Sequence, residues 1–214
     1  MTLLLPRGWS GSATLEVKRS VFRAEVARVD DEEAARAVVA AARRAHSDAR
    51  HHCSAFVVEV PDAQPVERSS DDGEPAGTGG MPILAALHGS GLVDIVCVVT
   101  RWFGGVKLGA GPLARAYGDA AGLALSQAPR VERVLRPQWR LHVPYARLGR
   151  LVDDLSRRGL VVSPEYGADA SLLVTAEPGV DVPAIVAALT QGVGEAEPHG
   201  EVAAELPGPP PLVV

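Results

Sequence analysis

The stretch DIVCVVTRWFGGVKLGAGPLARAYGDAA, residues 94–121, carries the clearest structural signal in this chain. Its first part, from Ile95 to Val99, is a continuous apolar run rich in β-branched residues, which is typical of a strand buried on both faces. A loop with four glycines follows. Pro112 suits the first helical position, because the missing N–H of proline has no partner there in any case. The sequence therefore predicts a buried strand, a glycine-rich loop and a helix, in that order.

The loop between this strand and this helix has the features of an anion-binding segment. Glycine lets a backbone approach a ligand closely, and a helix start offers unpaired N–H groups at the positive end of the helix dipole. The candidate anion-binding residues are Arg101, Trp102, Gly104, Gly105, Lys107, Gly109, Gly111 and Arg115. The alternative is that the glycines serve only a sharp turn and tight packing, because neither a nucleotide P-loop nor a dinucleotide-binding spacing is present.

Composition places the chain among ordinary globular proteins. Of its 214 residues, 47% are hydrophobic and 22% are charged, and the formal net charge is −5. This net charge argues against a protein that coats nucleic acid by bulk charge, but it is compatible with a local basic patch. The two cysteines, Cys53 and Cys97, make no disulfide framework, and no run approaches the ~18 apolar residues of a membrane span. Because the start of the sequence shows no secretory signal, we expect a cytoplasmic protein.

A group of titratable residues precedes the next expected strand, which we place from about Ser54 to Val60. The group contains His46, Asp48, His51, His52 and Cys53. Such side chains bind transition metals, form Cys–His nucleophile pairs, or hydrogen-bond a helix end and a neighbouring loop. The spacing matches no zinc signature, and adjacent strand residues point to opposite faces. The structural role is therefore favoured, and we predict no metal site and no catalytic residue.

Residues 61–80 form a long polar segment, PDAQPVERSSDDGEPAGTGG, which we predict to be a functional loop. Asp71, Asp72 and Glu74 suit a hard cation or a basic partner, although acidic loops are more often simply solvated. The loop leads into a short helix, expected over 82–88, and it brings Thr78 to the start of that helix. This helix start is a second candidate anion site.

Two further expectations concern the first half of the chain. Alternating apolar residues predict two short strands within 14–29, and Asp30 is expected to cap the helix that follows. The helix expected over 112–127 contains Gly118 and Gly122, which lower helix stability. We attribute their presence to a close approach of this helix to the sheet.

A boundary is expected near 128–137, and the pattern restarts beyond it. The expected elements are a strand over 138–143, a helix over 145–158, strands over 160–166 and 170–177, a helix over 182–190 and a strand over 193–203. This β-α-β-β-α-β order is that of a ferredoxin-like unit. The proline-rich end, residues 205–214, is expected to be a disordered tail.

Four motifs together give the chain a family resemblance. They are Lys18-Arg19-Ser20-Val21-Phe22, His46 through Ala55, Ser70 through Pro82, and Thr100 through Tyr117. In this order they resemble the Impact/YigZ family, although Gly79-Gly80-Met81 stands where many members carry Ala-Gly-Arg, and Pro112 where glycine is usual. The resemblance implies an α+β protein with two domains. The first, over 12–130, would have the ribosomal-protein-S-five domain-two-like fold; the second, over 137–204, would be ferredoxin-like, similar to domain five of elongation factor G.

Both folds recur in proteins that touch RNA or the ribosome. The resemblance therefore implies a cytoplasmic, translation-associated protein without a cofactor or a membrane partner, which binds RNA or the ribosome through the cationic glycine-rich loop. The accessory candidates are His46, Asp48, His51, Cys53, Asp72, Glu74 and Thr78. A non-enzymatic role is favoured, and two other classes stay open. One is a small enzyme acting on a phosphorylated or acyl substrate at the same loop, and the other is a protein–protein regulatory module.

Overall fold

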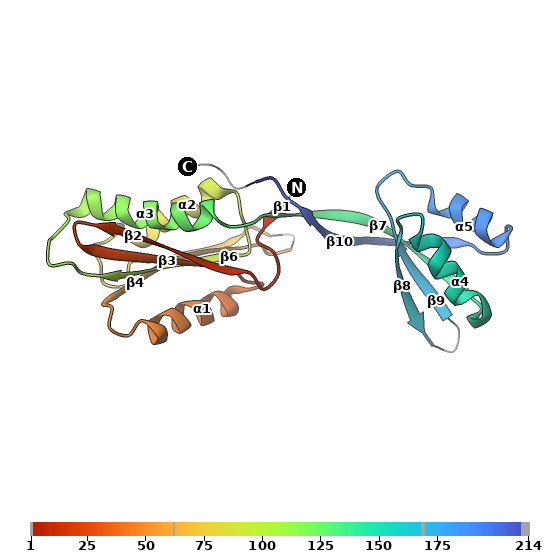
Figure 1. Ribbon diagram of the computed structural model, residues 1–214, viewed down its shortest axis with the longest axis horizontal. Coiled ribbons are helices and arrows are strands. Elements are labelled where there is room, and N and C mark those ends of the chain that lie inside the picture. Colours follow the sequence, from red (N-terminus) through yellow and green to blue (C-terminus); the bar gives the residue numbers. More distant parts are fainter. Residues whose placement is uncertain (1, 62, 168–169, 211–214) are drawn as a thin grey trace. The chain divides into compact units, whose positions relative to one another are not determined.

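The computed structural model describes residues 2–61, 63–167 and 170–210. The chain divides into two compact units (Figure 1). Unit 1 comprises Met1–Glu132 with Leu206–Val214, and unit 2 comprises Arg133–Glu205. Both units combine helices with antiparallel strands, so the expected mixed α+β class is confirmed. None of the described helices is both long and apolar enough to cross a membrane.

Unit 1 is built on a five-stranded sheet whose central strand is the buried run identified in the sequence. The strands in spatial order are β2 (Ser10–Val17), β3 (Ser20–Arg28), β6 (Ile95–Trp102), β4 (His51–Val58) and β5 (Val66–Ser70). All neighbouring strands pair antiparallel. Residues 95–101 of β6 are buried on both faces, which confirms the predicted buried strand.

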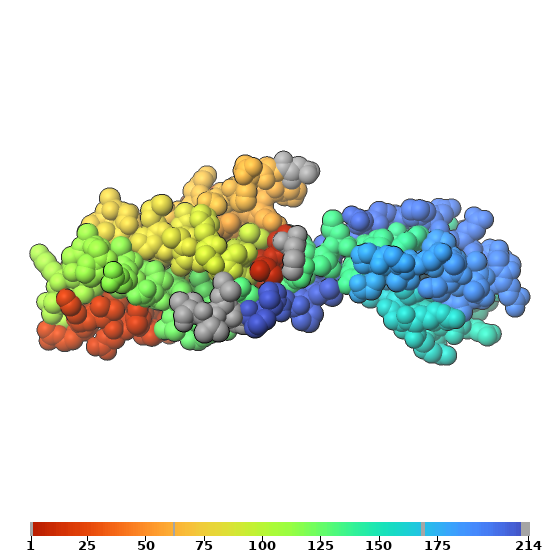
Figure 2. All heavy atoms as spheres, turned by 90° about the horizontal axis from the view of Figure 1, so that it is seen from above, coloured from red at the N-terminus to blue at the C-terminus, as the bar shows by residue number. Residues whose placement is uncertain are grey.

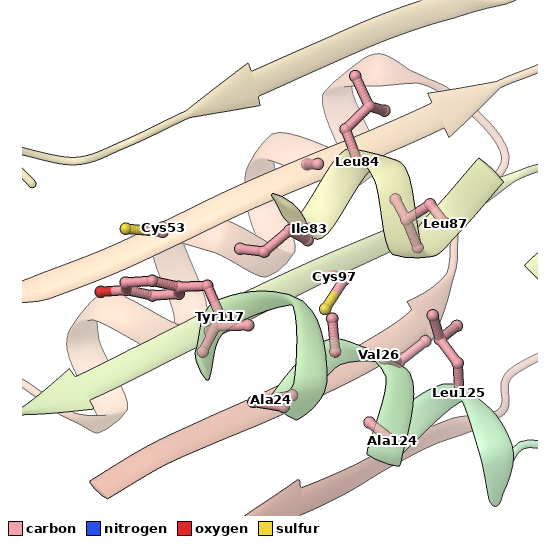
Figure 3. Close-up of a cluster of buried hydrophobic side chains, with 14 of the residues drawn as sticks. Ala24, Val26, Cys53, Ile83, Leu84, Leu87, Cys97, Tyr117, Ala124 and Leu125 are labelled. Atoms are coloured by element: carbon pink, nitrogen blue, oxygen red, sulfur yellow. The ribbon is translucent and has the colours of Figure 1, made fainter. Parts of the chain in front are cut away.

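Helices cover both faces of this sheet. On one face lies α1 (Glu32–Ala45), and on the other lie α2 (Gly80–Ser90) and α3 (Ala110–Ser126) (Figure 1). Alternation along β6 feeds both layers, because Val96 and Val98 face α1 while Cys97 and Val99 face α2 and α3. Figure 3 shows the larger core, in which side chains of α2 and α3 pack on the sheet.

Several local expectations need correction. The helix cap is Asp31 rather than Asp30, since the Asp31 carboxylate accepts a hydrogen bond of 2.7 Å from the Ala34 N–H. Strand β4 begins at His51, three residues earlier than expected, because His51–Cys53 pair with β6. Strand β5 lies inside the segment that was expected to be a loop throughout. Its sequence, VERSS, has no apolar alternation, and among the described strands it pairs only with β4.

The two helix glycines of α3 do not approach the sheet. A Cβ at Gly118 would meet only Pro82 of α2, at 3.7 Å, and a Cβ at Gly122 would meet nothing within 4 Å. A distance of 3.7 Å is ordinary van der Waals contact, so the packing of α3 on α2 does not require a glycine at position 118. Nothing in the packing requires a glycine at position 122.

Unit 2 contains the expected β-α-β-β-α-β succession. Its elements are β7 (Val131–Val143), α4 (Tyr145–Ser156), β8 (Val161–Tyr166), β9 (Ala170–Thr175), α5 (Val182–Thr190) and β10 (Ala196–Pro207). The strands lie in the order β10-β7-β9-β8, and β1 (Thr2–Leu4) also pairs with β7, which begins at Val131 inside unit 1. Leu141, Leu172 and Val186 lie in the core of unit 2.

The end of the chain differs from the expected disordered tail. Residues 205–207 form the end of β10, and the Gly208 N–H donates a hydrogen bond of 2.9 Å to the Arg130 carbonyl. Pairing with β7 gives these residues backbone partners that composition alone does not reveal. Residues 211–214 of the expected tail lie outside the described part of the chain.

Candidate functional site

The sequence motifs meet at one end of the sheet in unit 1. There β6 ends, while β3 and β4 begin. In the register of the sheet, Arg101 on β6 lies between Phe22 on β3 and His51 on β4. Three segments that are far apart in the chain are thus brought together by strand pairing.

Arg101 and Trp102, which were expected to serve one anion site, lie on opposite faces of the sheet. Successive strand residues alternate in direction. The Arg101 side chain lies on the face covered by α2 and α3, where it contacts Glu74. The Trp102 side chain lies on the face covered by α1, where it contacts Asp48. The two side chains therefore cannot bind the same ligand.

Arg101 is the centre of a buried polar network. Its Nη1 donates to Glu74 Oε1 at 2.6 Å, and the Tyr117 hydroxyl donates to the same oxygen at 2.8 Å. The side chains of Arg101 and Glu74 are only 7% and 5% exposed. The guanidinium carbon of Arg101 also lies 5.4 Å from the Phe22 ring centre and 5.6 Å from that of Phe103. The positive charge of Arg101 is therefore engaged inside the protein, by the Glu74 carboxylate and by the rings of Phe22 and Phe103.

The start of α2 already holds an anion, and that anion belongs to the protein. The Asp71 carboxylate accepts hydrogen bonds of 2.8 Å from the N–H groups of Gly77, Gly79 and Gly80. Burial raises the pKa of Asp71, but these three hydrogen bonds outweigh it and hold the pKa below its ordinary value. Thr78, expected at this helix start, is buried and donates its hydroxyl to the Pro75 carbonyl.

Asp72 joins the acidic loop to α1 and β4. Its carboxylate accepts hydrogen bonds from Arg43 Nη2, at 2.5 Å, and from the His52 N–H, at 2.6 Å. The Asp72 carbonyl lies 3.0 Å from His51 Nδ1. The loop and the histidine segment are thus within hydrogen-bond reach of one another, and their polar groups are used in holding the two segments together.

Cys53 is an unsuitable nucleophile in this environment. The side chain is fully buried, and its Sγ donates a hydrogen bond of 3.0 Å to the Asp71 carbonyl. Burial raises the pKa of the thiol to about 12, so the reactive thiolate is scarce at neutral pH. Cys53 and Tyr117 lie close together at one end of the core (Figure 3). Among the described residues, no group of three or more His, Cys, Asp or Glu side chains is arranged to hold a metal ion.

Trp102, His46 and Asp48 form a separate cluster on the α1 face. Trp102 Nε1 donates to Asp48 Oδ2 at 2.8 Å, and the Trp102 ring packs edge-on against the His46 ring at 5.3 Å. His46 Nε2 lies 3.4 Å from a carboxylate oxygen of Glu25. The indole is half-buried and engaged in these contacts.

The exposed part of this end of unit 1 contains residues that sequence reasoning missed. Phe103, directly after β6, has a side chain that is 54% exposed. Lys18 and Arg19 form the turn between β2 and β3, and both are exposed, with φ of 47° and 67°. Gly104 ties this turn to the loop, since its N–H donates to Ser20 Oγ at 3.1 Å. The loop and the hairpin turn lie at the same end of the unit in Figures 1 and 2.

We call Lys18, Arg19, Phe103 and Lys107 together the loop surface. All four are exposed, and they come from two chain segments. The sequence signal for the missing residues was present, because Lys18 and Arg19 interrupt the alternation of two strands and precede Phe22 in the first motif. Arg115 is also exposed, one turn further into α3.

The structural reason for a glycine differs from one position of the loop to the next. Gly105 and Gly109 have φ of 86° and 78°, which L side chains rarely adopt, so the turn itself requires glycine there. Gly111 faces open space. A Cβ at Gly104 would clash with the Arg19 main chain. The alternative that the glycines serve a sharp turn and tight packing thus has direct support at Gly104, Gly105 and Gly109, and it does not explain Gly111.

Comparison with known proteins agrees with the motifs. The family model of the Impact N-terminal domain matches residues 18–125. The chain is 41% identical over 160 residues to the IMPACT family member YigZ of Escherichia coli, covering 74% of this chain and 78% of that protein. It is 40% identical to an IMPACT family member of Haemophilus influenzae, over 73% of this chain and 76% of that protein.

A solved structure gives the same agreement in three dimensions. A crystal structure described as that of an hypothetical protein is 34% identical to this chain and has a TM-score of 0.63. The match covers 92% of this chain and 97% of that one. The motif order, the family match over half of the chain and relatives of about 40% identity lead to one conclusion: the chain belongs to the IMPACT family.

Proposed function

We propose that this protein is a cytoplasmic, translation-associated factor that binds single-stranded RNA, free or within the ribosome, through the loop surface. The observation that carries the proposal is the exposed Phe103, which is in the same loop as Lys107 and directly precedes Gly104, the residue hydrogen-bonded to Ser20 after the Lys18-Arg19 turn. Proteins that bind single strands combine stacking aromatic rings with cations that follow the phosphate backbone. The loop surface offers both.

The contacts beneath the loop surface support this role. The buried Arg101 guanidinium lies 5.6 Å from the Phe103 ring centre and is itself fixed by Glu74. A cation held against an aromatic ring restricts the ring's position, which lowers the entropy that is lost when a base stacks on it. In this proposal Trp102 and Arg101 do not touch RNA; Arg101 supports Phe103 from below.

The architecture of unit 2 adds a weaker argument. Its strand order, β10-β7-β9-β8, is the one expected for a ferredoxin-like domain, such as domain five of elongation factor G. Fold analogy does not by itself assign a function, so the proposal rests on the loop surface. An enzyme at the same place has less support, because Glu74 is engaged with Arg101 and the Cys53 thiol is buried.

The test is RNA binding as a function of salt. Fluorescence anisotropy with a labelled single-stranded RNA, together with co-sedimentation with ribosomes, compares the wild type with Lys107→Ala and Phe103→Ala. We expect Phe103→Ala to weaken binding by about 1–3 kcal/mol. Lys107→Ala should reduce the slope of log K against log salt by about 0.7. The matched control is Arg158→Ala, an exposed cation of unit 2. Absent binding at low salt, or binding unchanged by Lys107→Ala, would refute the proposal.

A further inference from the structure

A groove runs along the α1 side of the sheet in unit 1, away from the loop surface. A single helix about 10 Å wide cannot cover five strands that are about 4.8 Å apart. Here α1 packs on β6 and β4, through Val96, Val98 and Phe56, and leaves the edge strand β5 uncovered. The result is a cavity of about 450 Å³ between α1 and β5.

The residues that line this groove concentrate positive charge that the packing of α1 on the sheet does not require. The α1 wall carries Arg36 and Arg43, which are seven residues, or two helical turns, apart and therefore on the same side of the helix. Arg68 faces them from β5, where the register pairs it with Phe56. The described lining consists of Arg36, Val39, Ala40, Arg43, Ser54, Phe56, Arg68, Ser69 and Ser70, and it includes three arginines and no carboxylate.

The guanidinium groups are oriented but far from saturated. Arg36 donates to Glu32, and Arg43 donates to Asp72. Arg68 donates to the carbonyl of its neighbour Glu67. Each guanidinium has five N–H donors, so most donors in the groove are unused by these bonds. Two of the three charges are offset by carboxylates outside the lining, while no carboxylate in the described part of the chain pairs with Arg68.

We infer that the groove between α1 and β5 is a second anion-binding site, which takes a ligand of about nucleotide size through its phosphate group. Guanidinium forks bind phosphate bidentately, and donors on both walls of a groove suit a tetrahedral oxyanion better than a flat carboxylate. The hydroxyls of Ser54 and Ser70 on the strand side supply neutral donors, and Val39 with Ala40 offers an apolar wall to the rest of the ligand. The cavity lies within the usual range for small-molecule sites. This inference does not depend on the proposed RNA binding at the loop surface.

The experiment uses the full chain with three probes: pyrophosphate, adenosine monophosphate and adenosine. Isothermal titration calorimetry gives the affinities. Two-dimensional NMR of backbone amides and arginine Nε–H groups gives the location. We expect the two phosphorylated probes to bind and adenosine not to bind. Arg68 Nε–H and the amides of Ser69 and Ser70 should shift on binding.

Substitutions separate this groove from general charge effects. Arg68→Gln should weaken binding of both phosphorylated probes about tenfold or more, because a hydrogen-bonded charge is lost. Arg68 is exposed on an edge strand, so the fold should tolerate the change. The control is Arg44→Gln, which removes the same charge from α1 at an exposed position outside the groove lining. It should change the affinity by less than a factor of two.

The outcomes distinguish the source of the phosphate. If adenosine monophosphate binds and Arg68→Gln abolishes its binding, the site takes a free nucleotide-sized ligand. A short single-stranded RNA is titrated alongside the three probes. If only this RNA responds to Arg68→Gln, while the small probes bind weakly at the same amides, the phosphate belongs to a nucleic acid backbone. The inference is overturned if no phosphorylated probe shifts the Arg68 Nε–H signal. It is also overturned if Arg44→Gln weakens probe binding as much as Arg68→Gln does. None of these results depends on Lys107 or Phe103, so the loop-surface proposal fails or stands separately.

Discussion

Gly104 packs directly on the main chain of Arg19. A Cβ at position 104 would lie 2.0 Å from the Arg19 carbonyl carbon and 2.1 Å from its oxygen, distances that real Cβ atoms do not reach. Only a glycine allows this approach. The contact fixes the Lys18-Arg19 turn, whose two residues both have positive φ, against the segment that carries Phe103. The arrangement of the loop surface therefore depends on this close approach and on the hydrogen bond from the Gly104 N–H to Ser20 Oγ.

Gly104→Ala should lower the free energy of unfolding by about 1–3 kcal/mol, because the methyl group meets backbone atoms that cannot rotate away. Urea denaturation followed by circular dichroism measures the change. If the loop surface binds RNA, the same substitution should also weaken that binding, since the turn and the loop would separate. An unchanged midpoint would show that the two segments are not in contact.

Gly122→Ala is the matched control in the same unit and should act in the opposite direction. The added methyl group meets no atom within 4 Å, and the residue lies inside α3. Replacing glycine by alanine within a helix stabilises it by roughly 0.5–1 kcal/mol. The unfolding midpoint in urea should therefore rise. A fall would mean that the space beside Gly122 is filled in solution.

The buried pair of Glu74 and Arg101 should be costly to break from either side. Glu74→Gln or Arg101→Met leaves one charge buried without its partner, which typically costs about 3–5 kcal/mol. The double variant should lose clearly less than the sum of the two single losses. A double-mutant cycle by urea denaturation measures this coupling. Strict additivity would mean that the Nη1–Oε1 contact of 2.6 Å contributes nothing.

The strand and the helix around the loop can be predicted from the sequence, whereas the contacts of the side chains between them can be predicted only in part. The β-branched run of β6 and the helix after the loop were found because local composition determines them. The separation of Arg101 from Trp102 follows from strand alternation and was available from the sequence. The partner of Arg101 was not, because Glu74 lies 27 residues away and reaches it only through the tertiary fold.

Strand β5 and Phe103 show two other limits. Four of the five residues of β5 are polar and exposed, so its strand character comes from pairing with β4 rather than from any pattern of its own. Phe103 follows the buried run of β6. It is exposed because β6 ends at Trp102, so the chain has already left the sheet at position 103. Pattern rules describe residues inside regular elements, and these residues lie at an edge and at an end.

Neither cysteine should react with thiol reagents in the folded protein. Cys53 and Cys97 are fully buried, and burial raises the pKa of each thiol to about 12. Both the lack of access and the scarcity of thiolate slow the reaction. Labelling with a chromogenic disulfide at mildly alkaline pH should give no fast phase in buffer and two thiols in denaturant. Rapid native labelling of Cys53 would reopen its role as a nucleophile.

Asp71→Asn should destabilise unit 1 in a pH-dependent manner. Wild-type Asp71 has a lowered pKa because its carboxylate accepts hydrogen bonds from Gly77, Gly79 and Gly80. A group with a lowered folded pKa stabilises the protein above its unfolded pKa, about 3.9, and this contribution disappears as the pH falls through the folded value. The variant keeps an acceptor oxygen but loses the charge, so at neutral pH we expect a loss of about 1–3 kcal/mol. Urea denaturation from neutral pH down to about pH 3 should show the gap between the two proteins narrowing below about pH 4. A gap that stays constant over this range would mean that the negative charge of Asp71 is not what the start of α2 binds.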